Sequence, residues 1–261
     1  MRSALATLRE FILWLSQQDG FRSRIKAADA DYFNLSRRDE AEARAAPPRP
    51  APSINQARRT LELMPNSTPQ QKRDKAVFAL LCLTGIRVAA LVSLKIKHVD
   101  LREKSVTQNP REVATKFGKA IDTFFAKGFD DAETALADWI TYCDEVALYG
   151  PDDPLFSATA ITANSNSGFA TKGFTSKHWK STEPVRKIVR IAFEAAGITN
   201  YGPHAFRHML ARHAAKHCTS VAELVATSQN LGQTDVLTTL CSYGQISRDE
   251  QRKLITGNTS D

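Results

Sequence analysis

Three short stretches of the sequence carry side chains that could bind and react with an anionic group. They are residues 84–87 (TGIR), 204–208 (HAFRH) and 231–243, which begins LGQTD and ends in tyrosine. A guanidinium binds phosphate oxygens in pairs, histidine moves protons near neutral pH, and a phenol can act as a nucleophile. Taken singly, each stretch also has an ordinary structural explanation: a helix start, a helix surface, and a packed aromatic at a helix end.

The order of these stretches is more specific than any one of them. An arginine follows a buried apolar helix, a His-x-x-Arg pair comes far downstream, and a Leu-Gly segment with two threonines and a tyrosine follows. This combination resembles the catalytic domain of the tyrosine recombinases, the phage-integrase family. The resemblance covers about residue 53 to the C-terminus, and the phrases LTGIR and PHAFRH also look like helices of that family.

The resemblance implies site-specific recombination that integrates a mobile element, with DNA cleaved and rejoined through a 3′-phosphotyrosyl intermediate. Tyr243 would be the nucleophile, and because its phosphate ester retains the bond energy, rejoining would need no cofactor and no metal. Arg87 and Arg207 would clamp the non-bridging oxygens, where planar guanidinium serves better than lysine. His204, one helical turn from Arg207, would hydrogen-bond the phosphate or help to take the phenolic proton.

The resemblance also implies a lysine in a β-hairpin that protonates the leaving oxygen. The hairpin region here contains TKFGK over residues 115–119. We assign this role to Lys116, which we expect at a strand end before the turn, and hold Lys119 in reserve. A lysine in such a hairpin is otherwise a solvated residue that protects a sheet edge.

Two positions depart from the family pattern. Ala90 stands where the family commonly has a carboxylate, three residues after the first arginine, and Gln233 stands where it usually has His or Trp. A glutamine can donate a hydrogen bond to a phosphate oxygen, so Gln233 is a predicted phosphate contact, but it cannot shuttle a proton. We therefore predict reduced cleavage. The alternatives are a truncated or degenerate relative that binds attachment DNA without efficient cleavage, and a DNA-relaxing topoisomerase with the same phosphotyrosine chemistry.

The formal charge of +7 over 261 residues hides an uneven distribution. Residues 87–119 hold eight basic and three acidic side chains, a net charge of +5. Residues 172–190 hold six basic side chains and one acidic side chain, again a net charge of +5. Between them, residues 120–153 hold one lysine and nine carboxylates, a net −8. If the two basic segments meet in space they form a phosphate-binding face; otherwise they are solvated surface.

Four of the 11 prolines lie within residues 47–52, which predicts an extended linker. We expect a partial helical, core-binding-like piece over residues 1–46, the linker over 47–52, and the catalytic domain over 53–261. Apolar residues at helical spacing predict one helix in the first piece, with a second short helix near 27–35. In the family an N-terminal helical domain closes a clamp around the DNA, so we expect a truncated clamp here.

The catalytic domain is predicted to be mainly α with a small antiparallel β-sheet. We expect helices over 53–64, from Thr68-Pro69 through the apolar block 76–83, and over 88–94, 132–148, 183–196, 203–217, 221–230 and 234–242. Short strands are expected at 106–107, 113–115 and 121–125, with turns at Asn109-Pro110 and Gly118. Residues 157–181, rich in Ser, Thr, Asn and Gly, are expected to form a long loop.

The expected partner is a double-stranded DNA attachment site, with self-association into a tetramer on paired sites. The amphipathic segment 248–255 would then dock on a neighbouring subunit. The longest apolar run, 76–83, is too short for a membrane span, and four distant cysteines without a CxxC pair favour a reducing cytosol, next to the nucleoid. Histidine pairs at i, i+4 lack a third ligand, so no metal is expected.

Overall fold

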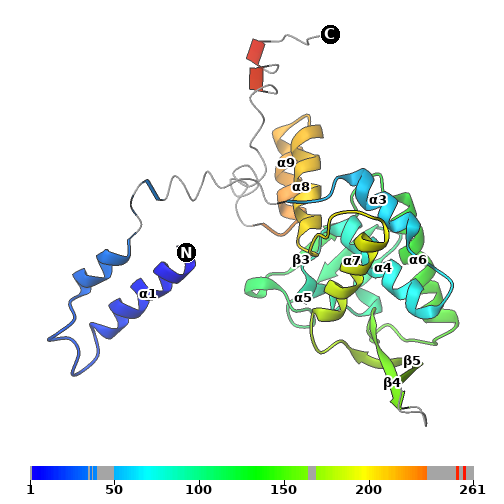
Figure 1. Cartoon of the computed structure of the whole chain (residues 1–261), viewed down its shortest axis with the longest axis horizontal. Helices are drawn as coiled ribbons and strands as arrows, with labels where there is room; N and C mark the ends of the chain where they lie inside the picture. The colour runs from blue at the N-terminus through cyan, green and yellow to red at the C-terminus, as the bar shows by residue number, and fades with distance from the viewer. Residues whose placement is uncertain are drawn as a thin grey trace. The chain divides into compact units, whose positions relative to one another are not determined.

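The computed structural model describes residues 2–34, 36, 38–39, 50–163, 169–233, 251–252 and 255–256. The chain divides into two compact units, Met1–Pro48 and Arg49–Asp261 (Figure 1). In the first unit, helix α1 (Arg2–Leu15) packs against a 3-10 helix, η1 (Ala27–Phe33), which is shorter than the second helix we predicted. Ala30 is fully buried there, whereas Phe11 and Trp14 are half exposed.

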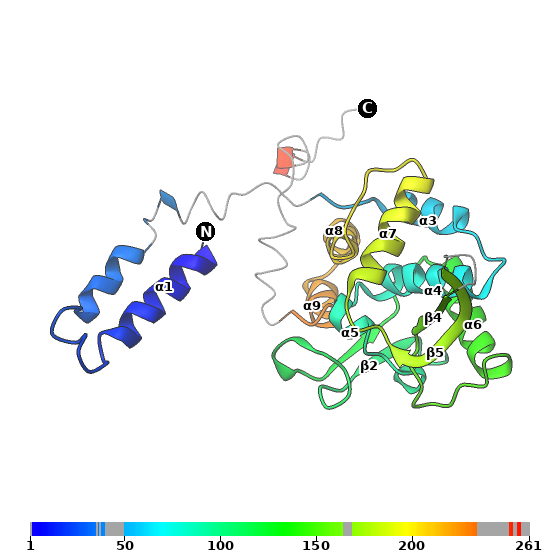
Figure 2. The same cartoon turned by 60° about the horizontal axis from the view of Figure 1, so that its bottom comes forward.

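The second unit is built around one buried helix, α4 (Pro69–Thr84). It begins as predicted, because Thr68 caps it reciprocally with Gln71 and Pro69 occupies the first turn. Every residue from 76 to 84 has no exposed surface, as expected of a helix that is apolar on all sides. The helices that pack around it are α3 (Ile54–Leu63), α6 (Asp130–Glu145), α7 (Glu183–Ala195) and α8 (Ala205–His217) (Figure 2).

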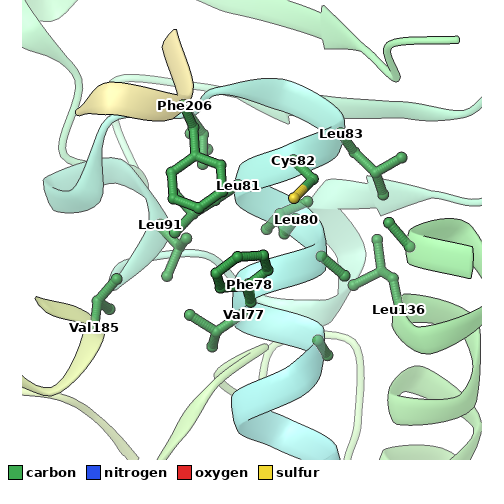
Figure 3. Close-up of a cluster of buried hydrophobic side chains, with 14 of the residues drawn as sticks. Val77, Phe78, Leu80, Leu81, Cys82, Leu83, Leu91, Leu136, Val185 and Phe206 are labelled. Carbon is green, nitrogen blue, oxygen red and sulfur yellow. The ribbon is translucent and has the colours of Figure 1, made fainter. Parts of the chain in front are cut away.

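Aromatic rings fix how α7 and α8 pack on the central helix. The ring of Phe78 on α4 meets the ring of Phe206 on α8 edge-on, with 5.0 Å between ring centroids (Figure 3). Phe78 also meets Phe193 of α7 edge-on, with 5.4 Å between centroids. All three side chains have at most 1% of their surface exposed. Edge-to-face ring pairs add directional contacts to the burial of apolar area, so the start of α8 is held firmly against α4.

Along the chain, three strands come between α5 (Val88–Leu91) and α6 and form an antiparallel sheet. The strand order is β1 (Val99–Asp100), β2 (Ser105–Gln108), β3 (Ile121–Phe124). A 3-10 helix, η2 (Ile96–His98), precedes β1, and another, η3 (Lys116–Gly118), lies between β2 and β3. The strand predicted at 113–115 is wrong. The carbonyl of Asn109 accepts from the N–H of Val113 (2.8 Å), and Ser93 Oγ accepts from the N–H of Ala114 (2.9 Å). These two backbone N–H groups therefore bond to a turn carbonyl and to a side chain, and not to a neighbouring strand.

The long loop predicted over 157–181 is also wrong. Strands β4 (Ser157–Ala163) and β5 (Phe169–His178) form an antiparallel hairpin that pairs Ser157 with His178. Its threonines are β-branched and favour extended backbone, a signal that the many serines, glycines and asparagines of this stretch of sequence concealed. Phe174 anchors this hairpin by meeting the ring of Trp139 on α6 edge-on at 5.4 Å.

Helix α9 (Val221–Asn230) follows α8, and the fold is mainly helical with small antiparallel sheets, as predicted. The predicted helix over 234–242 lies outside the described residues. Among the helices that the structure describes, none is both long enough and apolar enough to cross a membrane.

Candidate active site

The first predicted phosphate-binding residue, Arg87, is placed by the end of α4. That helix stops at Gly85, which has a left-handed backbone (φ +55°), and Arg87 then caps the short helix α5. A side chain at Gly85 would lie 3.2 Å from Leu210 and Leu231 and 3.3 Å from the Arg207 backbone. Glycine is therefore required here for both conformation and space.

The Arg87 side chain is half-buried, and its Nη2 donates to the carbonyl oxygen of Gly232 at 3.3 Å. Burial lowers the pKa of the Arg87 guanidinium from its ordinary value. A guanidinium nevertheless stays charged at neutral pH, so Arg87 brings a positive charge to this end of α9.

Arg207 is the third residue of α8, in its first turn, and is only 4% exposed. Its Nη1 donates to the carbonyl oxygen of Gly85 (2.8 Å), and its Nη2 donates to the carbonyl oxygen of Leu231. These are carbonyls at the C-terminal ends of α4 and α9, where the helix dipole is negative. The buried guanidinium thus joins two helix ends at one point.

The end of α9 is the common partner of the two arginines. Gly232 has φ +60°, its N–H donates to Gln229 (2.7 Å), and the N–H of Gln233 donates to Ser228 (3.0 Å). This is a Schellman motif, which ends a helix with glycine in the left-handed region. The carbonyl of Leu231 accepts from Arg207, and the carbonyl of Gly232 accepts from Arg87.

His204 and Gln233 lie close in sequence to these groups. His204 is exposed at the start of α8, and its ring meets His208 edge-on at 4.9 Å. It lies three residues before Arg207, a spacing that places both on the same side of the helix. Gln233 is half-buried and directly follows Gly232.

The hairpin lysines lie in the connection between β2 and β3. We expected Lys116 at a strand end, but it begins the 3-10 helix η3 instead, and Lys119 follows that helix. Lys119, Gly232 and Gln233 line one pocket of about 440 Å³ between the hairpin and α9, and Lys116 does not line it. Lys119 therefore faces the same pocket as Gln233, and which lysine acts stays a prediction.

Asn230 is a residue that the sequence analysis did not single out. It is the last residue of α9, and its side-chain amide pairs with both backbone groups of Phe124 on β3. The only signal in the sequence is an amide residue directly before Leu-Gly, and nothing local indicates a strand as its partner.

Ala90, where the family commonly has a carboxylate, is 1% exposed and belongs to the apolar core. A carboxylate at this position would enter apolar packing. Tyr243, the predicted nucleophile, lies outside the described residues, as does most of the segment 248–255. Among the residues described, no group of three or more His, Cys, Asp or Glu side chains is placed to hold a metal ion.

Several charges of the basic segment 87–119 are already paired. Lys97 lies 2.7 Å from Glu112 and 2.8 Å from Asp152, Lys95 lies 2.9 Å from Asp152, and Lys104 contacts Glu133 at 2.7 Å. Asp152 and Glu133 belong to the acidic segment 120–153. The net +5 of the basic segment therefore overstates the charge it offers to a partner.

Comparisons with known proteins establish the family of the chain. The model of the phage integrase family matches residues 53–245, and the chain belongs to that family. Tyrosine recombinase XerC of Bifidobacterium longum (strain DJO10A) is 28% identical over 174 residues, which are 66% of this chain and 43% of that protein. XerC of Pseudomonas aeruginosa (strain PAO1) is 27% identical over 209 residues, which are 78% of this chain and 59% of that protein. The chain thus spans about half the length of these two relatives.

Among solved structures, the fold is similar to that of the XerH site-specific recombinase bound to palindromic difH substrate in a post-cleavage complex. The TM-score is 0.63 at 17% identity, and the match covers 98% of this chain and 65% of that one. This similarity establishes the fold of the chain.

Proposed function

We propose that this protein is a site-specific recombinase that cleaves and rejoins DNA through a 3′-phosphotyrosyl intermediate. Membership of the phage integrase family supports this proposal. The observation that carries it is the convergence of Arg87 and Arg207 on adjacent carbonyls at the end of α9. Two permanent positive charges held at one point suit a phosphodiester whose transition state gains negative charge.

In the proposed reaction, the phenolic oxygen of Tyr243 attacks the phosphorus, and the bond from phosphorus to the 5′ oxygen breaks. His204 helps to take the phenolic proton, and a hairpin lysine, Lys116 or Lys119, gives a proton to the departing 5′ oxygen. Attack by a 5′ hydroxyl reverses these steps and releases Tyr243. One phosphate ester replaces another throughout, so no energy source is consumed.

The described residues support preorganisation of this site. Arg207 is held by two backbone carbonyls and Arg87 by a third, so neither guanidinium has to be ordered when DNA arrives. Donors fixed in advance stabilise a transition state better than donors that must reorganise. Gln233 would donate a hydrogen bond to a phosphate oxygen without supplying charge.

The proposed partners are double-stranded attachment DNA and other copies of the chain, four at a synapse. The segment 248–255 would dock on a neighbouring subunit, and the unit Met1–Pro48 would act as a core-binding-like piece on the DNA. A protein that acts on attachment DNA would work in the cytoplasm, at the nucleoid. Deletion from residue 248 onward should abolish synapsis and leave single-site binding intact.

The test uses a nicked suicide duplex carrying attachment-site DNA from the host locus, so that a cleaved strand cannot be rejoined. A covalent protein–DNA adduct on a denaturing gel is expected, and Tyr243→Phe should abolish it. Tyr32→Phe is the matched control, because Tyr32 is 88% exposed in the first unit and should leave the adduct unchanged. Absence of the adduct, or its persistence in Tyr243→Phe, contradicts the proposal.

A second candidate function is binding of attachment DNA without efficient cleavage. Two observations favour it: Ala90, where the family commonly has a carboxylate, is buried in the apolar core, and the amide of Gln233 cannot act as an acid or base near neutral pH. The variant Gln233→His distinguishes the two functions. A faint wild-type adduct that grows in this variant indicates a slow recombinase, whereas no adduct in either protein, with specific binding retained, indicates a binding protein.

A further inference from the structure

Asn230 joins the end of α9 to the edge of the three-stranded sheet. Its Oδ1 accepts from the N–H of Phe124 (2.6 Å), and its Nδ2 donates to the carbonyl oxygen of Phe124 (2.9 Å). A side-chain amide offers the same donor and acceptor as a peptide group. Since β3 is an edge strand, Asn230 occupies the place of one residue of a further strand.

A second contact extends this junction into the sheet. Thr123 Oγ1 donates to the backbone carbonyl of Asn230 (3.1 Å) and accepts from Gln108 Nε2 (2.9 Å) on β2. Thr123 is 2% exposed and Gln108 is 4% exposed. Buried polar chains of this kind hold their members in one geometry, because breaking any link leaves a buried group unsatisfied.

The junction lies between the two halves of the candidate site. Asn230 directly precedes Leu231 and Gly232, whose carbonyls accept from the two arginines. Strand β3 directly follows the connection that carries Lys116 and Lys119. The packing is also close, because a side chain on Gly232 would lie 2.6 Å from Ile121 Cδ1 at the start of β3.

We infer that Asn230 is a positioning residue, which holds the hairpin lysine at a fixed distance from the arginine pair. This inference rests on the proposed function. Asn230 takes no part in the chemistry; it sets where the proton donor stands relative to the phosphate. Its loss should therefore impair protonation of the leaving oxygen more than binding of the DNA.

The test compares two suicide substrates that differ in one atom. One has the ordinary 5′-bridging oxygen at the scissile phosphate, and the other has sulfur there. An unperturbed thiol has a pKa of about 8.5, so a thiolate is a stable leaving group that needs no proton from the protein. An alkoxide is far more basic and needs an acid to protonate it as it leaves. If a substitution only moves the acidic lysine out of place, the rate of adduct formation should recover on the sulfur substrate.

For Asn230→Asp, which keeps the acceptor and loses the donor, we expect adduct formation to fall about tenfold or more on the oxygen substrate. On the sulfur substrate, the rate of adduct formation by Asn230→Asp should return to within about twofold of wild type. The alanine variant of the lysine that acts as the acid, Lys116→Ala or Lys119→Ala, should recover in the same way. Arg87→Ala should stay impaired on both. Asn109→Asp is the matched control, since Asn109 uses only its acceptor, toward the N–H of Arg111 (3.0 Å).

Thr123→Val gives a second approach should Asn230→Asp fold poorly, because it removes both hydrogen bonds of Thr123 Oγ1, to Asn230 and from Gln108, and keeps the side-chain shape. Equal impairment of these variants on both substrates, or no impairment on oxygen, overturns the inference while the proposed function stands. Absence of any wild-type adduct on either substrate overturns both together.

Discussion

Arg207 Nη1 donates to the carbonyl oxygen of Gly85 at 2.8 Å, across 122 positions of sequence. The acceptor ends the buried helix α4, and the donor lies near the start of α8. Its second guanidinium nitrogen reaches the end of α9 at Leu231. One buried side chain therefore holds three helices and presents a positive charge at their meeting point.

Arg207→Lys should impair both folding and reaction. A single ammonium cannot replace two guanidinium nitrogens that point at different carbonyls, so at least one buried carbonyl loses its donor, at a cost of about 1–3 kcal/mol. Urea denaturation should show this loss, and adduct formation should fall by about 100-fold or more. Arg190→Lys is the control, because Arg190 is 51% exposed and should change neither measurement. Wild-type stability in Arg207→Lys contradicts the role we assign.

Gly85→Ala should destabilise the protein through both backbone and packing. A left-handed non-glycine residue costs about 1–2 kcal/mol, and the added methyl would also press on Leu210, Leu231 and the Arg207 backbone. Gly197→Ala separates the two costs, since Gly197 is also left-handed (φ +66°) with nothing within 4 Å of the added carbon. Unfolding free energies should rank Gly85→Ala below Gly197→Ala. Equal values would show that the close packing at Gly85 costs nothing.

The protein should lose stability in acid through the cluster around Lys97. Hydrogen bonds from Lys97, His98 and Lys95 lower the pKa of Glu112 to about 2, and those from Lys97 and Lys95 lower the pKa of Asp152 to about 2. Their ordinary values are 4.5 and 3.8, so this stabilisation is complete above about pH 4.5 and is lost as the pH falls toward 2. Thermal melts from pH 6 to pH 2.5 should show the decline.

The double variant Glu112→Gln, Asp152→Asn tests the assignment, since it should start less stable at pH 6 and decline less steeply. An unchanged slope would place the acid sensitivity elsewhere in the molecule.

DNA affinity should fall steeply with salt, but not every lysine of the segment 87–119 should contribute. Lys97 is bound by Glu112 and Asp152, whereas Lys119 lines the pocket beside Gln233. Lys119→Gln should lower the slope of log Kd against log salt by about 1, the effect of one lost phosphate contact. Lys97→Gln should leave the slope unchanged. A salt-independent affinity would count against DNA as the partner.

Local features of the sequence were enough to predict most of the helices. Thr68-Pro69 marked the start of α4, and Gly85 marked its end, because capping and left-handed backbone depend on residues close in the chain. The hairpin β4–β5 was missed because turn-forming residues dominated that stretch, and pairing partners up to 21 positions apart decided its strands.

The sequence by itself determined the family of this protein: it supplied two arginines, a histidine and a tyrosine in the order typical of that family, and the family model matches residues 53–245. Only the tertiary structure decided which groups meet. It placed Lys119 and Gln233 on one pocket, paired Lys97 with Asp152 of the acidic segment, and joined Asn230 to a strand 106 residues away. Such contacts depend on how α8, α9 and the sheet pack on α4, and no local pattern of residues encodes the partner of a side chain so far along the chain.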